Sequence, residues 1–168
     1  DENAVARFYA EARACSRINH PNAVSVLDFG RTDDNLLYLV MEFLRGRDLA
    51  RLVWEAGSLP WPRSADIIRQ VMGALSEAHD QGIIHRDIKP ENVLVEPLRT
   101  GGDFVKVVDF GLAKIRSDVA PGVTTPGLVC GTPDYMAPEQ GRGLPPDPRS
   151  DLYSAAVVLY YCVTGRLP

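Results

Sequence analysis

The stretch His85-Arg86-Asp87-Ile88-Lys89-Pro90-Glu91-Asn92 lies near the middle of the chain, and Asp109-Phe110-Gly111 follows it after a short predicted hairpin. The first stretch places a carboxylate, an ammonium group and an amide on one tight loop, and the second adds another carboxylate. Phosphoryl transfer from a metal-bound nucleotide needs a group that orients the attacking hydroxyl, a cation for the phosphoryl group and oxygen ligands for Mg²⁺. The two motifs, in this order, therefore predict phosphotransfer chemistry.

Composition excludes several classes of protein. The chain has 168 residues, of which 45% are hydrophobic and 24% charged, as in ordinary globular domains. Its formal net charge of -4 argues against binding to nucleic acid, which favours a basic surface. The cysteines (Cys15, Cys130 and Cys162) fit no zinc spacing, so we expect reduced thiols. The most apolar stretch, residues 152–163, is shorter than the roughly 20 residues of a membrane span, and we expect no membrane segment here.

Hydrophobic spacing predicts one helix and two strands, followed by a mostly helical region. Val5, Phe8, Ala12 and Cys15 recur at helical spacing. Strands are expected at 24–29 and 36–41, helices at 47–56 and 62–82, short strands at 83–84, 93–95 and 105–108, and a last helix that opens at Asp151. Between them, residues 115–129 are rich in Gly, Pro and Thr and predict a loop.

The ordered motifs resemble those of Hanks-type serine/threonine protein kinases, and the resemblance extends over essentially the whole chain. The residue usage resembles that of bacterial members of the family. The resemblance implies an α+β, bilobal fold in truncated form. Residues 1–42 would form a partial β-rich N-lobe, and residues 43–168 a partial helical C-lobe with the hinge, the catalytic loop and the activation segment. Only ten residues precede Glu11, and none is Lys or Gly. The glycine-rich loop and the ATP-anchoring lysine are therefore expected upstream, and later helices downstream, so the fragment alone is expected to be inactive.

The resemblance assigns the chemistry to particular side chains. Asp87 would orient the substrate hydroxyl, and Lys89 would contact the transferred phosphoryl group, as in the Ser/Thr-directed branch. Asn92 and Asp109 would bind Mg²⁺, with Mn²⁺ as the alternative ion. Thr132, in a segment (131–139) that resembles the end of an activation segment, would hydrogen bond toward Asp87 and Lys89. Asp28-Phe29-Gly30 is a second copy of the Asp-Phe-Gly motif, which we interpret as a coincidence within a strand.

The resemblance also places the ATP site. Glu11 would pair with the ATP-anchoring lysine, although a solvated charge on a helix face is the alternative. Met41 would be the gatekeeper, the backbone from Glu42 to Leu44 would hydrogen bond to adenine, and Leu94 would pack beneath the ring. Strand and core packing is the alternative role for these hinge-region positions.

Further residues would have structural or regulatory roles by the same resemblance. His85 and Phe110 would join a stacked apolar column with Cys15 and Val26, and Gly111 completes the second motif. Glu139 would pair with an arginine of a later helix. Asp151 would hold the backbone of the catalytic loop or, as an alternative, cap the last helix.

A regulatory site is expected in the predicted loop. Phosphate on Thr124 or Thr125 would dock on Arg86 and order the loop.

These assignments predict ATP-dependent phosphorylation of serine or threonine on protein substrates by a signalling kinase, with self-phosphorylation in trans as a further expectation. The expected localisation is cytoplasmic, with a membrane anchor elsewhere in a longer protein left open. One alternative is a pseudokinase or scaffold. Another is a small-molecule phosphotransferase of the aminoglycoside-kinase type, against which Lys89 and the segment 131–139 argue.

Overall fold

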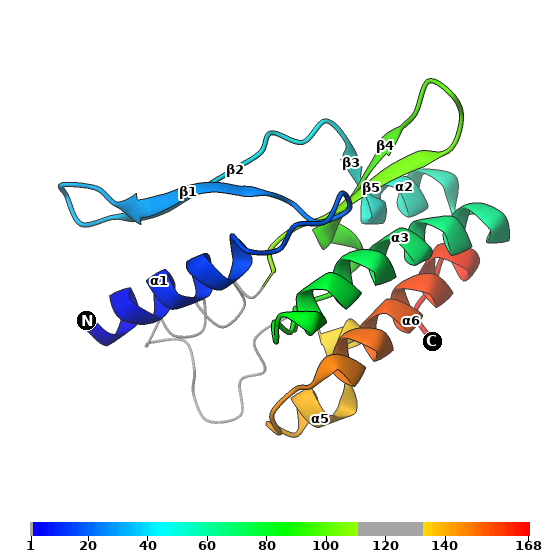
Figure 1. Cartoon of the computed structure of the whole chain (residues 1–168). Coiled ribbons are helices and arrows are strands. Elements are labelled where there is room, and N and C mark those ends of the chain that lie inside the picture. Colours follow the sequence, from blue (N-terminus) through cyan, green and yellow to red (C-terminus); the bar gives the residue numbers. More distant parts are fainter. Residues whose placement is uncertain (1, 111–132) are drawn as a thin grey trace.

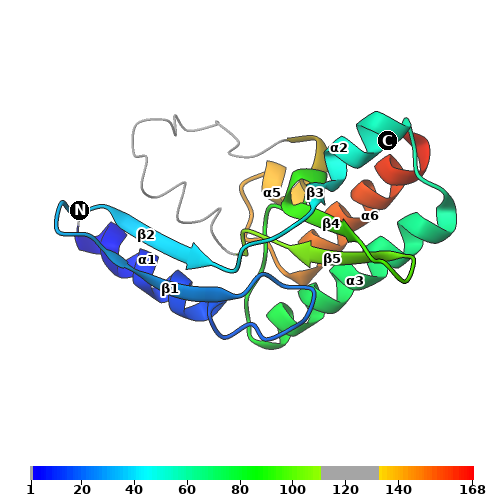
Figure 2. The same cartoon turned by 90° about the horizontal axis from the view of Figure 1, so that it is seen from above.

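The computed structural model describes residues 2–110 and 133–168. In its first part, helix α1 (Glu2–Cys15) covers one face of an antiparallel pair of strands, β1 (Val26–Arg31) and β2 (Leu37–Met41) (Figures 1 and 2). The helix buries Phe8, Ala12 and Cys15, which lie on one face at helical spacing. The helix and two strands expected from the sequence are therefore present.

The larger part joins a three-stranded sheet to helices. The antiparallel sheet has the order β3-β4-β5, and helices α3 and α6 lie side by side beneath it (Figures 1 and 2). The elements are β3 (Arg47–Asp48), α2 (Leu49–Ala56), α3 (Trp61–Asp80), the 3₁₀ turn η1 (Pro90–Asn92), β4 (Val93–Pro97), β5 (Asp103–Val107), the 3₁₀ turn η2 (Pro133–Tyr135), α5 (Pro138–Gly141) and α6 (Pro148–Thr164).

The core lies between the sheet and α3. Ile67, Val71 and Leu75 on α3 are fully buried, at the i, i+4, i+8 spacing that places side chains on one helix face. Val93 and Val105 on β4 and β5 are also fully buried, because alternate residues of a strand face the same side. The β4–β5 hairpin turns at Gly101 and Gly102, both with positive φ, as the expected glycine turn requires.

Two expectations about strands and helix ends are wrong. Ile83 and Ile84 form no strand; instead Ile83 N–H donates to Ala78 carbonyl and Gly82 N–H to His79 carbonyl, which closes the end of α3 around a glycine with φ +74°. The segment 47–56 is not helical throughout, because residues 47–48 pair with β4 as strand β3.

The last helix starts earlier than expected. It begins at Pro148, and Asp147 is its N-cap, with a side chain that accepts a hydrogen bond from Arg149 N–H. Proline suits this first position because the missing N–H has no partner within a helix there. Asp151 is therefore inside the first turns and is not the cap. Among residues 2–110 and 133–168, no helix combines the length and the apolar character that crossing a bilayer requires.

We expect Leu75→Ala to reduce the free energy of unfolding by about 2–5 kcal/mol, since it removes a fully buried side chain from tight packing. Leu98→Ala is the control, because Leu98 is 46% exposed. Urea unfolding followed by circular dichroism measures both. Equal effects of the two substitutions would contradict the placement of the core.

Candidate active site

One buried carboxylate holds the backbone of the loop that follows α3. Asp151 is 1% exposed; its Oδ2 accepts a hydrogen bond from His85 N–H and its Oδ1 one from Arg86 N–H, both at 2.8 Å. His79 Nε2 lies 2.8 Å from the same Oδ2. The backbone of Arg86 has φ +71°, a conformation that non-glycine residues rarely adopt. The loop is therefore fixed from α6 in a strained conformation.

His85 is fully buried and has a defined tautomer. Its Nε2 lies 2.8 Å from Val108 carbonyl, which only accepts, so Nε2 carries the hydrogen and Nδ1 accepts from Asp87 N–H at 3.3 Å. Burial lowers the pKa of His85, which favours this neutral ring. The ring packs edge-on against Phe110 at 4.8 Å between centroids, and Cys15 Sγ donates to Phe110 carbonyl. Contacts thus run from α1 to the loop.

The loop brings three functional groups within hydrogen-bonding distance. Lys89 Nζ lies 2.8 Å from Asp87 Oδ2, and the two side chains are 18% and 20% exposed. Asn92 Nδ2 donates to Asp87 carbonyl at 2.8 Å and to Asp87 Oδ2 at 3.2 Å. The amide oxygen of Asn92 is the atom left to accept or to bind a cation. Asp87 is therefore held by both the ammonium and the amide.

The second motif reaches the same place from β5. Val108 N–H donates to Asn92 carbonyl at 3.0 Å, which brings the next residue, Asp109, beside the loop. Asp109 has φ +64°, so the chain turns sharply at this carboxylate. A carboxylate and an amide oxygen are ligands that suit Mg²⁺, which is usually held through one or two protein oxygens together with phosphates. The donor set of Asp109 and Asn92 fits that ion.

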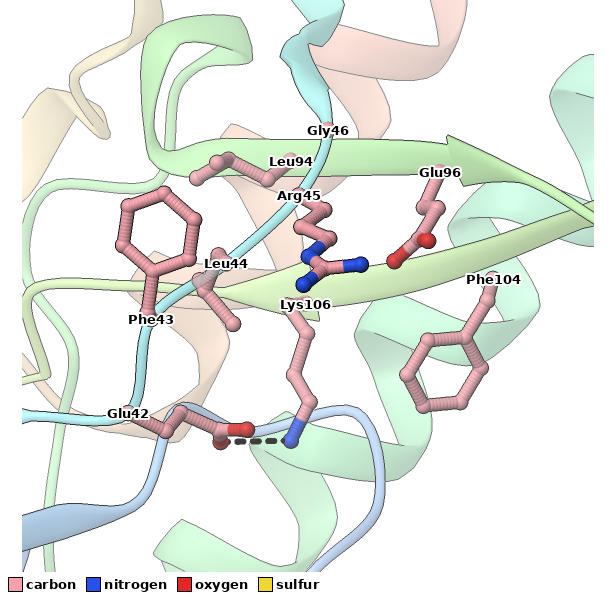
Figure 3. A pocket seen from close by; sticks show the side chains of 9 residues that line it. All are labelled: Glu42, Phe43, Leu44, Arg45, Gly46, Leu94, Glu96, Phe104 and Lys106. Carbon is pink, nitrogen blue, oxygen red and sulfur yellow. Dashed lines mark hydrogen bonds and ion pairs between the residues drawn. The ribbon is translucent and has the colours of Figure 1, made fainter.

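A pocket of about 160 Å³ lies where residues 42–46 cross β4 and β5 (Figure 3). Its lining consists of Glu42, Phe43, Leu44, Arg45, Gly46, Leu94, Glu96, Phe104 and Lys106. Glu42 N–H donates to Ser25 carbonyl at 3.0 Å, so the carbonyl of Glu42 and the backbone of Leu44 are the groups that could bind a planar base. Leu94 points into the space between the strands and the crossing segment.

Three other predicted site residues lie on α1, at the end of β2 and on α5. Glu11 lies on α1, one turn before Cys15. Met41 lines a small apolar pocket with Cys15 and Phe110. Glu139 accepts a hydrogen bond from the Ser150 hydroxyl of α6. Gly111, Thr124, Thr125 and Thr132 lie outside the described residues.

Three residues of the site were missed by the sequence analysis. His79 and Lys106 contact Asp151 and Glu42, and Gln140 Nε2 donates to Arg86 carbonyl at 2.9 Å. Lys106 alternates with the buried valines of β5, so its position on the open face could have been read from the strand pattern. His79 and Gln140 act through long-range contacts for which the sequence holds no local signal.

Comparisons with known proteins all lead to one class of protein. The family model described as protein kinase domain matches residues 1–168. The whole chain is 54% identical to serine/threonine-protein kinase pkn3 of Myxococcus xanthus, covering 31% of it, and 42% identical to PknL, a kinase of the same class from Mycobacterium tuberculosis, covering 40%. A crystal structure of the PknI kinase domain of Mycobacterium tuberculosis matches the whole chain at a TM-score of 0.76 and 28% identity, over 59% of its own length. The chain therefore spans less than half of these curated relatives.

Asp151→Asn should destabilise the loop, because an amide offers one acceptor oxygen where the carboxylate offers two to backbone N–H groups. We expect the free energy of unfolding to fall by about 1–3 kcal/mol, which is the cost of leaving a buried donor without a partner. Amide hydrogen exchange at His85 and Arg86 should accelerate. Asp33→Asn, in the exposed β1–β2 turn, is the control; unchanged exchange in Asp151→Asn would contradict the role.

Proposed function

The chain belongs to the protein kinase domain family, and on that premise we propose that it forms part of the catalytic domain of a bacterial serine/threonine protein kinase that uses ATP. The observation that carries this proposal is the cluster of Asp87, Lys89 and Asn92 on one loop, with Asp109 brought beside it by the Val108–Asn92 hydrogen bond. These groups match, type by type, what phosphoryl transfer to a hydroxyl requires.

Each side chain has a distinct part in the proposed reaction. Asp87 accepts the hydrogen bond of a serine or threonine hydroxyl and points its oxygen at the phosphorus atom. Lys89, now paired with Asp87, contacts the transferred phosphoryl group. Asn92 and Asp109 would hold Mg²⁺, or Mn²⁺ in its place, and the ion would neutralise negative charge on the phosphates. The held orientation of Asp87 supports the reaction because positioning and electrostatics supply most of the catalysis.

The base of ATP would lie against the segment 42–44. The carbonyl of Glu42 and the backbone of Leu44 would hydrogen bond to adenine, with Leu94 below the ring and Met41 as the gatekeeper. Glu11 on α1 would pair with an ATP-anchoring lysine of an adjoining strand. Since ATP is used inside the cell, we place this domain in the cytoplasm.

The alternative functions are less well supported. A pseudokinase would be expected to have lost one of the four polar residues of the site, yet Asp87, Lys89, Asn92 and Asp109 are all present. A small-molecule phosphotransferase would not need the segment 131–139, and the relatives reported above are named as serine/threonine-protein kinases. Protein substrates are therefore the proposed acceptors.

A regulatory phosphate on Thr124 or Thr125 is also proposed, added by another copy of the protein. Arg86 supports it: within the described part of the chain, its buried Nε has no hydrogen-bond partner. A phosphate would bring a charge of about -1.5 to -2 and three acceptor oxygens to such a donor. Thr132 would then link the substrate to Asp87 and Lys89.

The full-length protein should transfer phosphate from ATP to serine or threonine, and Asp109→Ala should reduce the rate at least about 100-fold, because the metal loses its main protein ligand. Asp28→Ala is a matched control from the second Asp-Phe-Gly copy. Labelling with γ-³²P-ATP, followed by phosphoamino acid analysis, measures both. Activity that survives in Asp109→Ala, or is lost equally in Asp28→Ala, would argue against the proposed site.

Mass spectrometry of the active full-length protein should find phosphate on Thr124 or Thr125. The double substitution Thr124→Val and Thr125→Val should lower activity, and Arg86→Ala should remove the difference between phosphorylated and dephosphorylated protein. Thr100→Val, in the β4–β5 turn, controls for loss of an unrelated hydroxyl. Active protein without phosphate at either threonine would rule out this regulation.

A further inference from the structure

One ion pair joins three segments at the edge of the pocket. Glu42 Oε1 accepts a hydrogen bond from Lys106 Nζ at 2.6 Å and another from Ser25 N–H at 2.7 Å. Lys106 Nζ also donates to Ala23 carbonyl at 3.0 Å. The segment before β1, the segment after β2 and strand β5 therefore meet at the Glu42–Lys106 pair. Figure 3 shows this pair.

The pair is partly shielded from water, unlike a fully exposed surface ion pair. The side chains of Lys106 and Glu42 are 15% and 29% exposed, and the Lys106 ammonium lies 5.9 Å from the centre of the Phe104 ring, within cation–π range. Burial alone would raise the pKa of Glu42, but the hydrogen bonds from Lys106 and Ser25 lower it overall. The lowered pKa keeps the Glu42 carboxylate charged at neutral pH. Its attraction to the Lys106 ammonium is screened less than between two fully exposed groups.

The location of the pair ties it to the nucleotide site. Glu42 is the first residue of the segment whose backbone would bind the base. Lys106 is the direct register partner of Leu94, which would pack beneath the ring. The strand of Lys106 then runs into Asp109, the proposed metal ligand. A displacement of this pair would therefore shift the base-binding backbone relative to both Leu94 and Asp109.

We propose that Lys106 is a positioning residue for the nucleotide. Through its ion pair, Lys106 fixes the distance between the Glu42–Leu44 backbone and the Leu94 side chain, which is the gap that the base would occupy. This inference rests on the proposed use of ATP. Lys106 would not touch the reacting atoms. It acts through the Glu42 carboxylate, so its removal should weaken nucleotide binding more than the chemical step.

The fold has other contacts that hold the same strands without this pair. Val107 N–H donates to Asn22 carbonyl at 2.8 Å, and Val24 N–H donates to Val107 carbonyl at 2.9 Å. These backbone bonds keep β5 against residues 22–24 when the Lys106 side chain changes. The role of Lys106 can therefore be separated from folding.

The test compares Lys106→Met, Lys106→Arg, Glu42→Gln and a control, Arg47→Met, in the full-length protein. Arg47 forms an ion pair of 2.7 Å with Glu55 nearby, but its side chain is 52% exposed. Isothermal titration calorimetry with Mg·ADP measures binding, and steady-state kinetics separate KM for ATP from kcat. Lys106→Met should weaken Mg·ADP binding and raise KM about five- to tenfold with kcat within about twofold. Glu42→Gln should do the same to a smaller extent, Lys106→Arg should restore most of the affinity, and Arg47→Met should change neither.

The outcomes separate this inference from the proposed function. Unchanged Mg·ADP affinity in Lys106→Met and Glu42→Gln would overturn the positioning role, as would a fall in kcat at constant KM or failure of both variants to fold. If the wild-type protein transfers no phosphate but the affinities change as expected, the kinase proposal fails and the positioning of the nucleotide stands.

Discussion

The site depends on the hydrogen bonds that the Asp151 carboxylate accepts from the backbone of the loop. Its two oxygens hold the adjacent N–H groups of His85 and Arg86, and this keeps Arg86 in a left-handed conformation. A charge that is 1% exposed is costly to bury, and it is tolerated here because its acceptors are occupied by backbone donors and by His79. The carboxylate loses its hydration on burial, and its hydrogen bonds fix the backbone of His85 and Arg86. That backbone orients the side chain of the next residue, Asp87.

From this anchor, a continuous set of contacts crosses the molecule. The neutral ring of His85 bonds to Val108 carbonyl and packs on Phe110, whose carbonyl accepts from Cys15 of α1. These groups are buried and closely packed. A displacement of α1 would therefore displace Phe110, the His85 ring and the loop that carries His85. Glu11 lies on the same helix as Cys15, one turn before it. These contacts give α1 a physical connection to the loop of residues 85–92.

Sequence patterns predicted what depends on neighbours along the chain. The apolar stripe of α3 and the glycines of the β4–β5 turn led to correct elements, because local spacing and positive φ decide them. The two isoleucines at 83–84 misled the strand prediction, since Ile83 N–H closes the end of α3 and neither residue pairs in a sheet. The partners of Asp151 and Glu42 could not be predicted: His79 and Lys106 are far away in sequence, and only packing brings them there. Asp147 was missed as the cap because Asp151 matched the same residue preference.

The two copies of the Asp-Phe-Gly motif differ in backbone conformation, and this difference decides what each carboxylate can do. Asp28 lies within β1, where it pairs with Val40 in the ladder and its carboxylate meets Tyr38 on an exposed face. Asp109 follows β5 and has positive φ, as has Arg86; in the described residues the only other non-glycine case is Asn35, a residue type that tolerates this conformation in turns. Backbone strain is retained where the surroundings enforce it, and both enforced positions adjoin the polar cluster. The carboxylate that turns out of its strand beside Asn92 is therefore the one suited to bind a cation, and the identical tripeptide in β1 is not.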